Sequence, residues 1–218
     1  MTFIVAIQLN DSIIIASDNK KITISEDGSL NISNENLSKM FPWKKGIITG
    51  TGEYYVISRS VKIFNNYKGL PPEYLSDCLD VSRRLREFEI GKGYYQVANT
   101  KLMYSSYTEK GAQLYRVEAF DPNEPYQVTA AEPMDITIWL FNPSVETIAV
   151  NLQELYDDLK DRSFFKNNNE WVDYYIVRLS LIFKKQSQQD YLMSQSFDIF
   201  FQSKDGFVYD QISNIFAG

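Results

Sequence analysis

The sequence contains no histidine and, among its 218 residues, a single cysteine, Cys78. Without histidine the chain cannot build a Ser-His-Asp triad, a Cys-His pair or a histidine-ligated zinc site. One cysteine excludes an internal disulfide framework, and we expect Cys78 to be a small core residue of a helix. A hydrolase built on this chain therefore needs a mechanism that uses no histidine.

An excess of basic residues is also lacking. The chain carries 22 Lys and Arg against 28 Asp and Glu, a formal net charge of -6. Nucleic-acid binding would need a clustered basic surface, so we expect no nucleic-acid partner. The only notable basic cluster, Arg83, Arg84 and Arg86, is interrupted by Leu85 and followed by Glu87. This pattern indicates a solvated helix face.

Long hydrophobic runs and metal-ligand clusters are missing as well. No apolar run is long enough to span a bilayer, and the amino terminus lacks the basic leader of a signal peptide. The segment Gly50-Thr51-Gly52 lacks the lysine-serine continuation of a phosphate-binding loop. We therefore expect a cytoplasmic protein with no membrane partner, no metal and no cofactor.

What the chain does contain is a succession of strand-like and helical patterns over residues 1–218, which we interpret as one domain. Strands are expected at residues 3–9, 13–16, 47–48, 101–107, 113–120, 126–130, 136–141, 197–201 and 207–212. Helices are expected after Glu53, after Pro71-Pro72, and over 148–159 and 172–183. In the second helix, the residues at helical spacing are Cys78, Val81, Leu85 and Phe88. Residues 25–38 form a polar stretch.

The order of these elements predicts the architecture. Strands come first, followed by two helices, more strands, two more helices and closing strands. The first two strands are apolar without alternation, which is typical of a sheet covered on both faces. Helices that arrive in pairs between antiparallel strand groups predict an α+β fold. We expect a four-layer αββα sandwich, with two antiparallel sheets between helical layers.

Thr2 follows the initiator methionine directly and opens the first strand. If Met1 is removed, Thr2 becomes a free amino terminus with its own hydroxyl nucleophile. Its α-amine can then accept the hydroxyl proton, so no other base is needed. Such an amine has an unperturbed pKa of roughly 7.7 to 8, and a nearby cation lowers it further. This is a mechanism that a histidine-free chain can use.

Several motifs together resemble a known family. Thr2 opens a strand, Ala16-Ser17-Asp18 follows some sixteen residues later, and Lys39 precedes two apolar residues. Residues 47–52 form a glycine-rich strand end that leads into a helix, and residues 111–117 and 198–208 are similar to two further strands of the family. The chain thus resembles the proteasome β-subunit family of N-terminal-nucleophile hydrolases, of the bacterial proteasome-related type. The αββα sandwich is also that family's fold.

The resemblance implies a role for three residues of the first forty. Thr2 would supply the nucleophile through Oγ and the base through its α-amine. Asp18 would orient and compensate a lysine, which best matches Lys39. A lysine ammonium beside the threonine lowers the proton affinity of its hydroxyl and amine. Lys20 and Lys21 lie close to Asp18 in the sequence and remain alternatives for this lysine.

Three further residues receive roles from the same resemblance. Gly50 corresponds to the glycine whose backbone N–H forms the oxyanion hole. Asp190 and Ser194 approximate the residues that support the threonine amine, with a one-residue shift at the serine. The substrate pocket is implied around residues 49–55, where Tyr54 and Tyr55 suggest an aromatic lining.

Two hypotheses of function follow. The first is a threonine-type peptidase or amidohydrolase that acts on peptides or unfolded proteins. The resemblance implies a ring-like homo-oligomer for it, and an unfoldase partner. The second is a catalytically silent, proteasome-like scaffold or partner-binding subunit in which Met1 is retained. Residues 136–144 lack the Gly-Ser-Gly-Ser turn of the family, whose serine supports the nucleophile.

Overall fold

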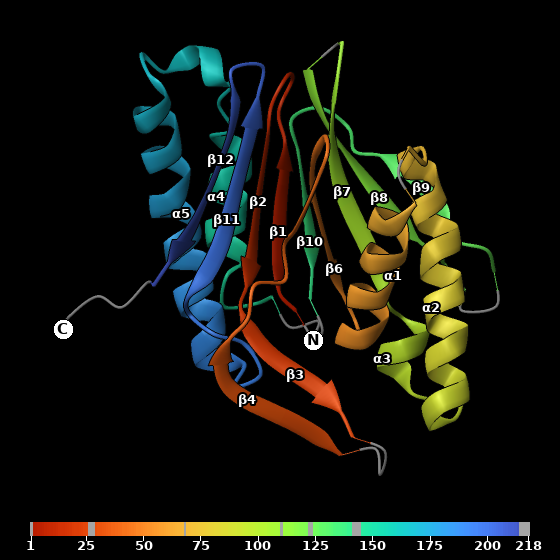
Figure 1. Ribbon diagram of the computed structural model, residues 1–218. Coiled ribbons are helices and arrows are strands. Elements are labelled where there is room, and N and C mark those ends of the chain that lie inside the picture. Colours follow the sequence, from red (N-terminus) through yellow and green to blue (C-terminus); the bar gives the residue numbers. More distant parts are fainter. Residues whose placement is uncertain are drawn as a thin grey trace.

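The computed structural model describes residues 2–25, 29–67, 69–109, 111–121, 124–140 and 145–213 (Figure 1). Met1 and residues 141–144 lie outside the described residues. The predictions that concern Met1 and the missing Gly-Ser-Gly-Ser turn therefore also fall, in whole or in part, outside them. The strands are β1 (Ile4–Gln8), β2 (Ile13–Asp18), β3 (Lys20–Ile24), β4 (Leu30–Asn36), β5 (Phe41–Trp43), β6 (Gly46–Thr51), β7 (Lys101–Thr108), β8 (Gly111–Glu118), β9 (Gln127–Ala130), β10 (Asp135–Trp139), β11 (Phe197–Ser203) and β12 (Gly206–Ile212). The helices are α1 (Tyr54–Asn66), α2 (Leu75–Ile90), α3 (Tyr95–Ala98), α4 (Ala149–Asp157) and α5 (Asn168–Gln189), with short 3-10 turns η1 (Pro72–Tyr74) and η2 (Arg162–Phe164).

Two antiparallel sheets of five strands form the centre of the molecule. One has the order β10-β1-β2-β11-β12, and the other has the order β5-β6-β7-β8-β9. Helices α4 and α5 cover the outer face of the first sheet, and α1 and α2 cover the second (Figure 1). The predicted α+β fold, an αββα sandwich, is therefore confirmed.

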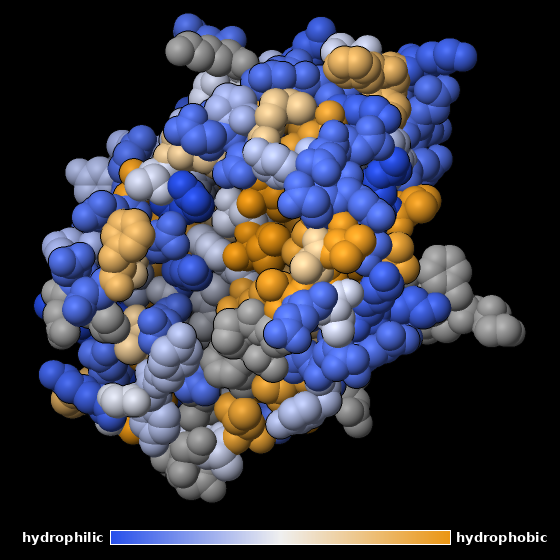
Figure 2. All heavy atoms as spheres, turned by 180° about the vertical axis from the view of Figure 1, so that it is seen from behind, coloured by the Kyte–Doolittle hydropathy of each residue, from blue (hydrophilic) through white to orange (hydrophobic). Residues whose placement is uncertain are grey.

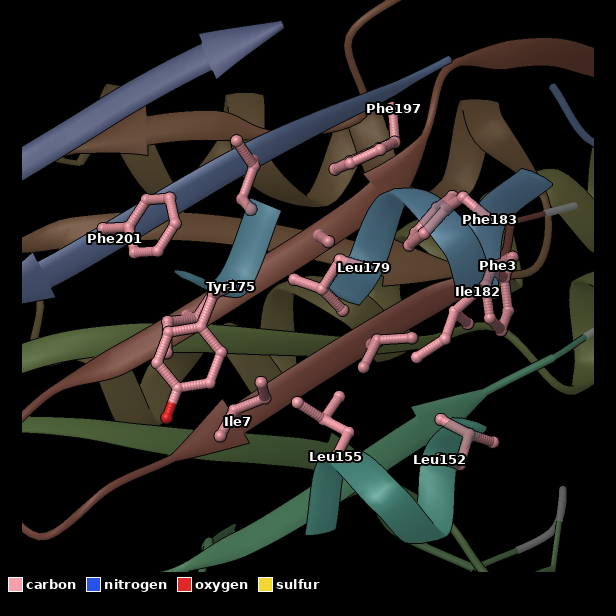
Figure 3. Close-up of a cluster of buried hydrophobic side chains, with 14 of the residues drawn as sticks. Phe3, Ile7, Leu152, Leu155, Tyr175, Leu179, Ile182, Phe183, Phe197 and Phe201 are labelled. Atoms are coloured by element: carbon pink, nitrogen blue, oxygen red, sulfur yellow. The ribbon is translucent and has the colours of Figure 1, made fainter. Parts of the chain in front are cut away.

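The first hairpin shows why its sequence does not alternate. Val5 and Ile7 of β1 pack against α4 and α5, while Ile4 and Ala6 point to the core between the two sheets. Every residue of β1 and β2 is buried. Figure 3 shows the outer cluster, in which Phe3 lies beside Phe183 with ring centroids 4.7 Å apart. The start of β1 is thus fixed by packing as well as by strand pairing.

A second hairpin, β3 with β4, was not predicted. Residues 25–38 were interpreted as a polar stretch, yet β4 occupies half of them and pairs with β3. In Figure 1 this hairpin extends away from the sandwich, below the two large sheets. Ile22 is its one described side chain that is fully buried. The available signal was the alternation of Ile22, Ile24, Leu30 and Ile32 with polar residues on either side of Asp27-Gly28, which is typical of a hairpin.

Helix α2 forms where expected but turns a different face inward. Cys78 is buried as predicted, whereas Val81, Leu85 and Phe88 are exposed. Arg83 is buried, so the interpretation of this arginine as part of a solvated face was wrong. Its guanidinium lies over the ring of Tyr126, 5.6 Å from the centroid. Contacts with the second sheet, which the sequence alone does not contain, set the orientation of the helix.

The surface is not uniformly polar. Figure 2 shows the molecule from behind: hydrophobic residues gather in the middle of this face and hydrophilic ones surround them. Within the part of the chain that the structure describes, no helix is long and apolar enough to cross a membrane.

Candidate active site

Thr2 lies at the start of β1, next to the end of β2. The Phe3 backbone N–H donates to Asp18 Oδ1 at 2.8 Å, and the Asp18 N–H donates to the Phe3 carbonyl at 3.0 Å. On the other side, Thr51 Oγ1 donates to the Thr2 carbonyl at 3.2 Å. Thr2 is therefore held between the first sheet and the end of β6 in the second. It is 5% exposed.

Asp18 and Lys39 form a buried ion pair beside Thr2. Lys39 Nζ lies 3.0 Å from both carboxylate oxygens of Asp18, and the two side chains are 6% and 0% exposed. Asp18 Oδ2 also accepts the backbone N–H of Lys20 at 3.1 Å. Burial lowers the pKa of Lys39, and the charge of Asp18 opposes that shift. The pair thus holds a lysine cation whose proton is easier to remove than in water.

The geometry distinguishes the three candidate lysines. Lys39 makes the ion pair with Asp18. Lys20 Nζ instead donates to the carbonyl of Tyr191. Lys21 contributes to the wall of the cavity next to Thr2. Lys39 is consequently the lysine that occupies the position implied by the resemblance.

A small cavity adjoins Thr2. Its volume is about 10 Å³, room for about one water molecule. Its walls are Thr2, Lys21, Ile22, Lys39, Phe41, Gly52, Tyr54 and Ile57. Tyr54 is thus on the cavity, as the expected aromatic lining requires. Tyr55 is 44% exposed, and the Arg86 guanidinium lies over its ring, 4.9 Å from the Tyr55 ring centroid.

Two glycines at the end of β6 compete for the role of oxyanion donor. Gly50 pairs with Leu102 in β7, and a Cβ at Gly50 would lie 2.5 Å from the Lys101 carbonyl oxygen. Close strand packing therefore requires Gly50 whatever its chemical role. Gly52 has a φ of +116°, a conformation that favours glycine, and it lies on the cavity with Thr2. Sequence reasoning selected Gly50 and did not weigh Gly52.

Asp190 and Ser194 lie on the segment between α5 and β11. Asp190 ends α5 and accepts the backbone N–H of Leu192 at 2.9 Å. Ser194 Oγ accepts the Asn19 backbone N–H at 3.1 Å and lies 2.8 Å from Asn19 Oδ1. Ser194 is therefore hydrogen-bonded to Asn19, the residue that follows Asp18. Asp190 shapes the turn that presents this serine.

Asp198 is a buried carboxyl near the ion pair that sequence reasoning did not select as a site residue. It lies in β11, opposite Ser17 of β2, and is 1% exposed. Burial raises its pKa, and its charge raises the pKa of Lys39. Gln211 Nε2 donates to Asp198 Oδ1 at 3.2 Å. The available signal was its position at the start of the segment 198–208, which resembles a strand of the proteasome family.

The described residues contain no group of three or more His, Cys, Asp or Glu side chains that could hold a metal ion. The groups that the structure places around Thr2 are the ion pair of Asp18 and Lys39 and the end of β6. Together with Thr2, these can supply a nucleophile, a tuned cation and backbone donors.

The comparisons with known proteins concern the fold. No family model and no curated protein matches the sequence. Among solved structures, the chain has the fold of bacterial proteasome-related proteins. One similar structure is that of a Gly-1 mutant of Anbu from Hyphomicrobium sp. strain MC1. It matches at TM-score 0.64 and 14% sequence identity, and the match covers 98% of this chain and 87% of that one.

Two other Anbu structures are similar to the same extent. The Anbu complex from Pseudomonas aeruginosa, described as a helical assembly, matches at TM-score 0.67 and 12% identity over 96% of this chain and 85% of that one. Anbu (ancestral beta-subunit) from Yersinia bercovieri matches at TM-score 0.65 and 12% sequence identity. The match covers 96% of this chain and 86% of that one. At this identity the likeness establishes the fold, and with it the predicted resemblance to proteasome-related proteins at the level of architecture.

Proposed function

We propose that this chain is a threonine peptidase or amidohydrolase of the N-terminal-nucleophile type, which becomes active when Met1 is removed. The observation that carries the proposal is the buried pair of Asp18 and Lys39, 3.0 Å apart, whose lysine lines the cavity next to Thr2. A buried charge is costly unless it is paired, so such pairs need a structural or chemical reason. Here the pair adjoins a threonine that can become the amino terminus.

In the proposed reaction, Thr2 Oγ forms a bond to the carbonyl carbon of the substrate, and its proton passes to the Thr2 α-amine. The tetrahedral intermediate then collapses. The C–N bond of the substrate breaks as the α-amine donates the proton to the departing nitrogen. A water molecule attacks the resulting ester in the same way and releases the second product, which restores the Thr2 hydroxyl.

Lys39 acts on this proton transfer through its charge. A cation near the α-amine lowers the pKa of that amine, and it also stabilises the threonine oxygen as it loses its proton. Asp18 keeps Lys39 in place and compensates its charge. The backbone N–H groups at the end of β6, at Gly50 or Gly52, are the proposed donors to the oxyanion. Ser194 is proposed to support the site through its hydrogen bonds to Asn19, and Asp190 by shaping the turn that presents Ser194.

The substrate class and the assembly belong to the same proposal. We propose a peptide or unfolded-protein substrate in the cytoplasm, a homo-oligomer, and an unfoldase as partner. The helical assembly of Anbu from Pseudomonas aeruginosa supports the homo-oligomer, because that protein has the same fold.

One observation favours the second hypothesis, a silent scaffold. Thr2 is 5% exposed, and the cavity next to it holds about one water molecule. A nucleophile that stays covered cannot reach a substrate. If Met1 is retained, its peptide bond also converts the proposed base into an amide.

Two measurements separate the hypotheses. Intact-mass spectrometry of the protein made in its native cytoplasm should show the loss of one methionine, and complete retention of Met1 would refute the enzyme. In the second, a threonine-directed epoxyketone should label the wild type, and Thr2→Ala should abolish both labelling and hydrolysis of fluorogenic peptides. Thr23→Ala, a change on the β3–β4 hairpin, is the matched control and should keep both activities. A processed wild type that is inert in both assays supports the scaffold.

A further inference from the structure

Helix α2 carries a row of exposed apolar side chains on its outer face. Val81, Leu85 and Phe88 are 48%, 46% and 89% exposed, and we call these three residues the α2 stripe. They are spaced by four and three residues, so they lie on one side of the helix. Tyr74, just before the helix, is 47% exposed and lies seven residues before Val81. The stripe is therefore a continuous apolar line on the outside of the molecule.

The fold of the monomer does not need this stripe. The buried residues Leu75, Cys78 and Leu79 make the contacts of α2 with the core. In Figure 1, α2 lies at the outer edge of its layer, so the face turned away from the sheet is uncovered. Isolated exposed apolar residues are ordinary, but a row of this kind marks an interaction surface.

The residues around Val81 have a self-complementary arrangement. Asp77 precedes Val81 by four residues, and Arg84 follows it by three. If a second α2 lies antiparallel, with a two-fold axis at Val81, residues at equal distances on either side come together. Asp77 of each copy then lies beside Arg84 and Leu85 of the other, within about one residue rise of 1.5 Å.

The same axis pairs aromatic residues at the two ends. Tyr74 and Phe88 are each seven residues from Val81, so each Tyr74 meets the Phe88 of the other copy. Arg84 is 72% exposed and already binds Asp80 of its own helix at 2.8 Å. Its guanidinium has five N–H donors, so it can bind a second carboxylate at the same time. The resulting interface has an apolar centre, two crossed ion pairs and an aromatic contact at each end.

We propose that the α2 stripe is a homodimer interface, in which α2 of a second copy packs antiparallel across a two-fold axis at Val81. Its occupant is thus another molecule of this chain. The proposal is independent of the catalytic proposal, because it needs neither Met1 removal nor Thr2.

The first test measures self-association by analytical ultracentrifugation. Phe88→Asp and Val81→Asp should each weaken it at least tenfold, since both place a charge in the interface. Val150→Asp is the matched control: Val150 is 67% exposed on α4, and its change should leave the association unaltered. Circular dichroism and thermal melting verify that the variants are folded. A wild type that is monomeric at every concentration, or association that survives both α2 changes, refutes the proposal.

Charge reversal tests the predicted orientation. Asp77→Arg and Arg84→Asp should each weaken association several-fold, and the double variant should restore it. A parallel or unrelated packing gives no such restoration.

The outer face of α5 is the alternative surface, since Val177 and Leu181 are 67% and 44% exposed there. Association abolished by Val177→Asp but not by Phe88→Asp would move the interface to α5 and overturn the proposal.

A cross-link tests the two-fold axis directly. With a cysteine at the axis, Val81→Cys should give a disulfide-linked dimer under mild oxidation on a non-reducing gel. The wild type serves as the control, because its single cysteine, Cys78, is buried at 6% exposure. Val150→Cys should show much slower cross-linking. Equal cross-linking of the two variants means random collision and contradicts the axis.

Discussion

Two buried ion pairs lie on either side of the end of β6, and they differ in chemistry. Lys39 contacts both oxygens of Asp18 at 3.0 Å, while Arg86 contacts Glu53 at 3.5 Å, and all four side chains are almost fully buried. Lysine can lose its proton within the ordinary pH range when burial lowers its pKa, whereas arginine stays charged. The cation of the first pair can therefore take part in tuning a proton transfer, whereas the cation of the second pair keeps its charge.

The surroundings of the two pairs support this difference. Glu53 is the N-cap of α1 and accepts the backbone N–H of Val56 at 2.9 Å, and Arg86 joins α2 to that cap. This pair thus orients two helices of one layer. The pair of Asp18 and Lys39 instead joins the start of β5 to the end of β2, next to Thr2. Burial alone does not identify a functional ion pair. The type of cation and the residues next to the pair distinguish the two cases.

The largest expected effect comes from breaking the Asp18 pair. Lys39→Ala should lower the free energy of unfolding by about 3–5 kcal/mol, because Asp18 is left buried without its cation. It should also lower kcat/KM by about 100-fold or more. Adding Asp18→Asn to a Lys39→Met variant should recover much of the stability and none of the activity. Urea unfolding and peptide hydrolysis measure the two quantities. Recovery of activity in the double variant would contradict a role for the charge.

The second pair should affect stability alone. Arg86→Met leaves Glu53 without its cation, so we expect a loss of about 1–3 kcal/mol in the free energy of unfolding. The rate of peptide hydrolysis should be unchanged at a temperature where the variant is folded. Lys101→Met breaks the more exposed pair with Glu118 and should cost less than about 1 kcal/mol, which makes it the reference. Loss of catalysis in Arg86→Met would remove the distinction between the pairs.

The pH dependence of stability should also distinguish them. Since burial lowers the pKa of Lys39 below its ordinary value of 10.5, the unfolded chain binds more protons than the folded one between the lowered pKa and 10.5. Stability should therefore rise with pH across that window, and Lys39→Met should abolish the rise. Arg86→Met should retain it, because arginine does not titrate there. Comparing variants cancels the contribution of Tyr126, whose pKa burial raises to about 12. Urea titrations at several pH values measure the slopes.

The smallest expected effect concerns Asp198. Its negative charge raises the pKa of Lys39, so Asp198→Asn should allow Lys39 to lose its proton at lower pH. The alkaline limb of the kcat/KM profile should then move toward neutral pH, while the maximum changes little. Asp210→Asn, on the exposed strand β12, is the control and should leave the limb in place. An unmoved limb in Asp198→Asn would limit Asp198 to a structural role.

Much of the fold could be predicted from local patterns. The apolar runs at residues 3–9 and 13–16 correspond to β1 and β2, whose faces are both covered, and the helical spacing after Glu53 corresponds to α1. The β3–β4 hairpin was missed because its segment was interpreted as a polar stretch, although Ile22, Ile24, Leu30 and Ile32 alternate with polar residues around Asp27-Gly28. The inward face of α2 was also beyond reach, because the Tyr126 ring and the Glu53 carboxylate decide which arginines are buried.

The sequence by itself determined the chemistry that is open to this protein. Because the chain has no histidine, we propose Thr2 and its α-amine as nucleophile and base, and its apolar runs determine which strands are buried. Only the tertiary structure decided that Lys39, twenty-one positions from Asp18, is its partner, while Lys20 and Lys21 nearby are not. The physical reason is that an ion pair depends on distance in space. That distance is set where β5 and β6 meet the end of β2, by the packing of the two sheets.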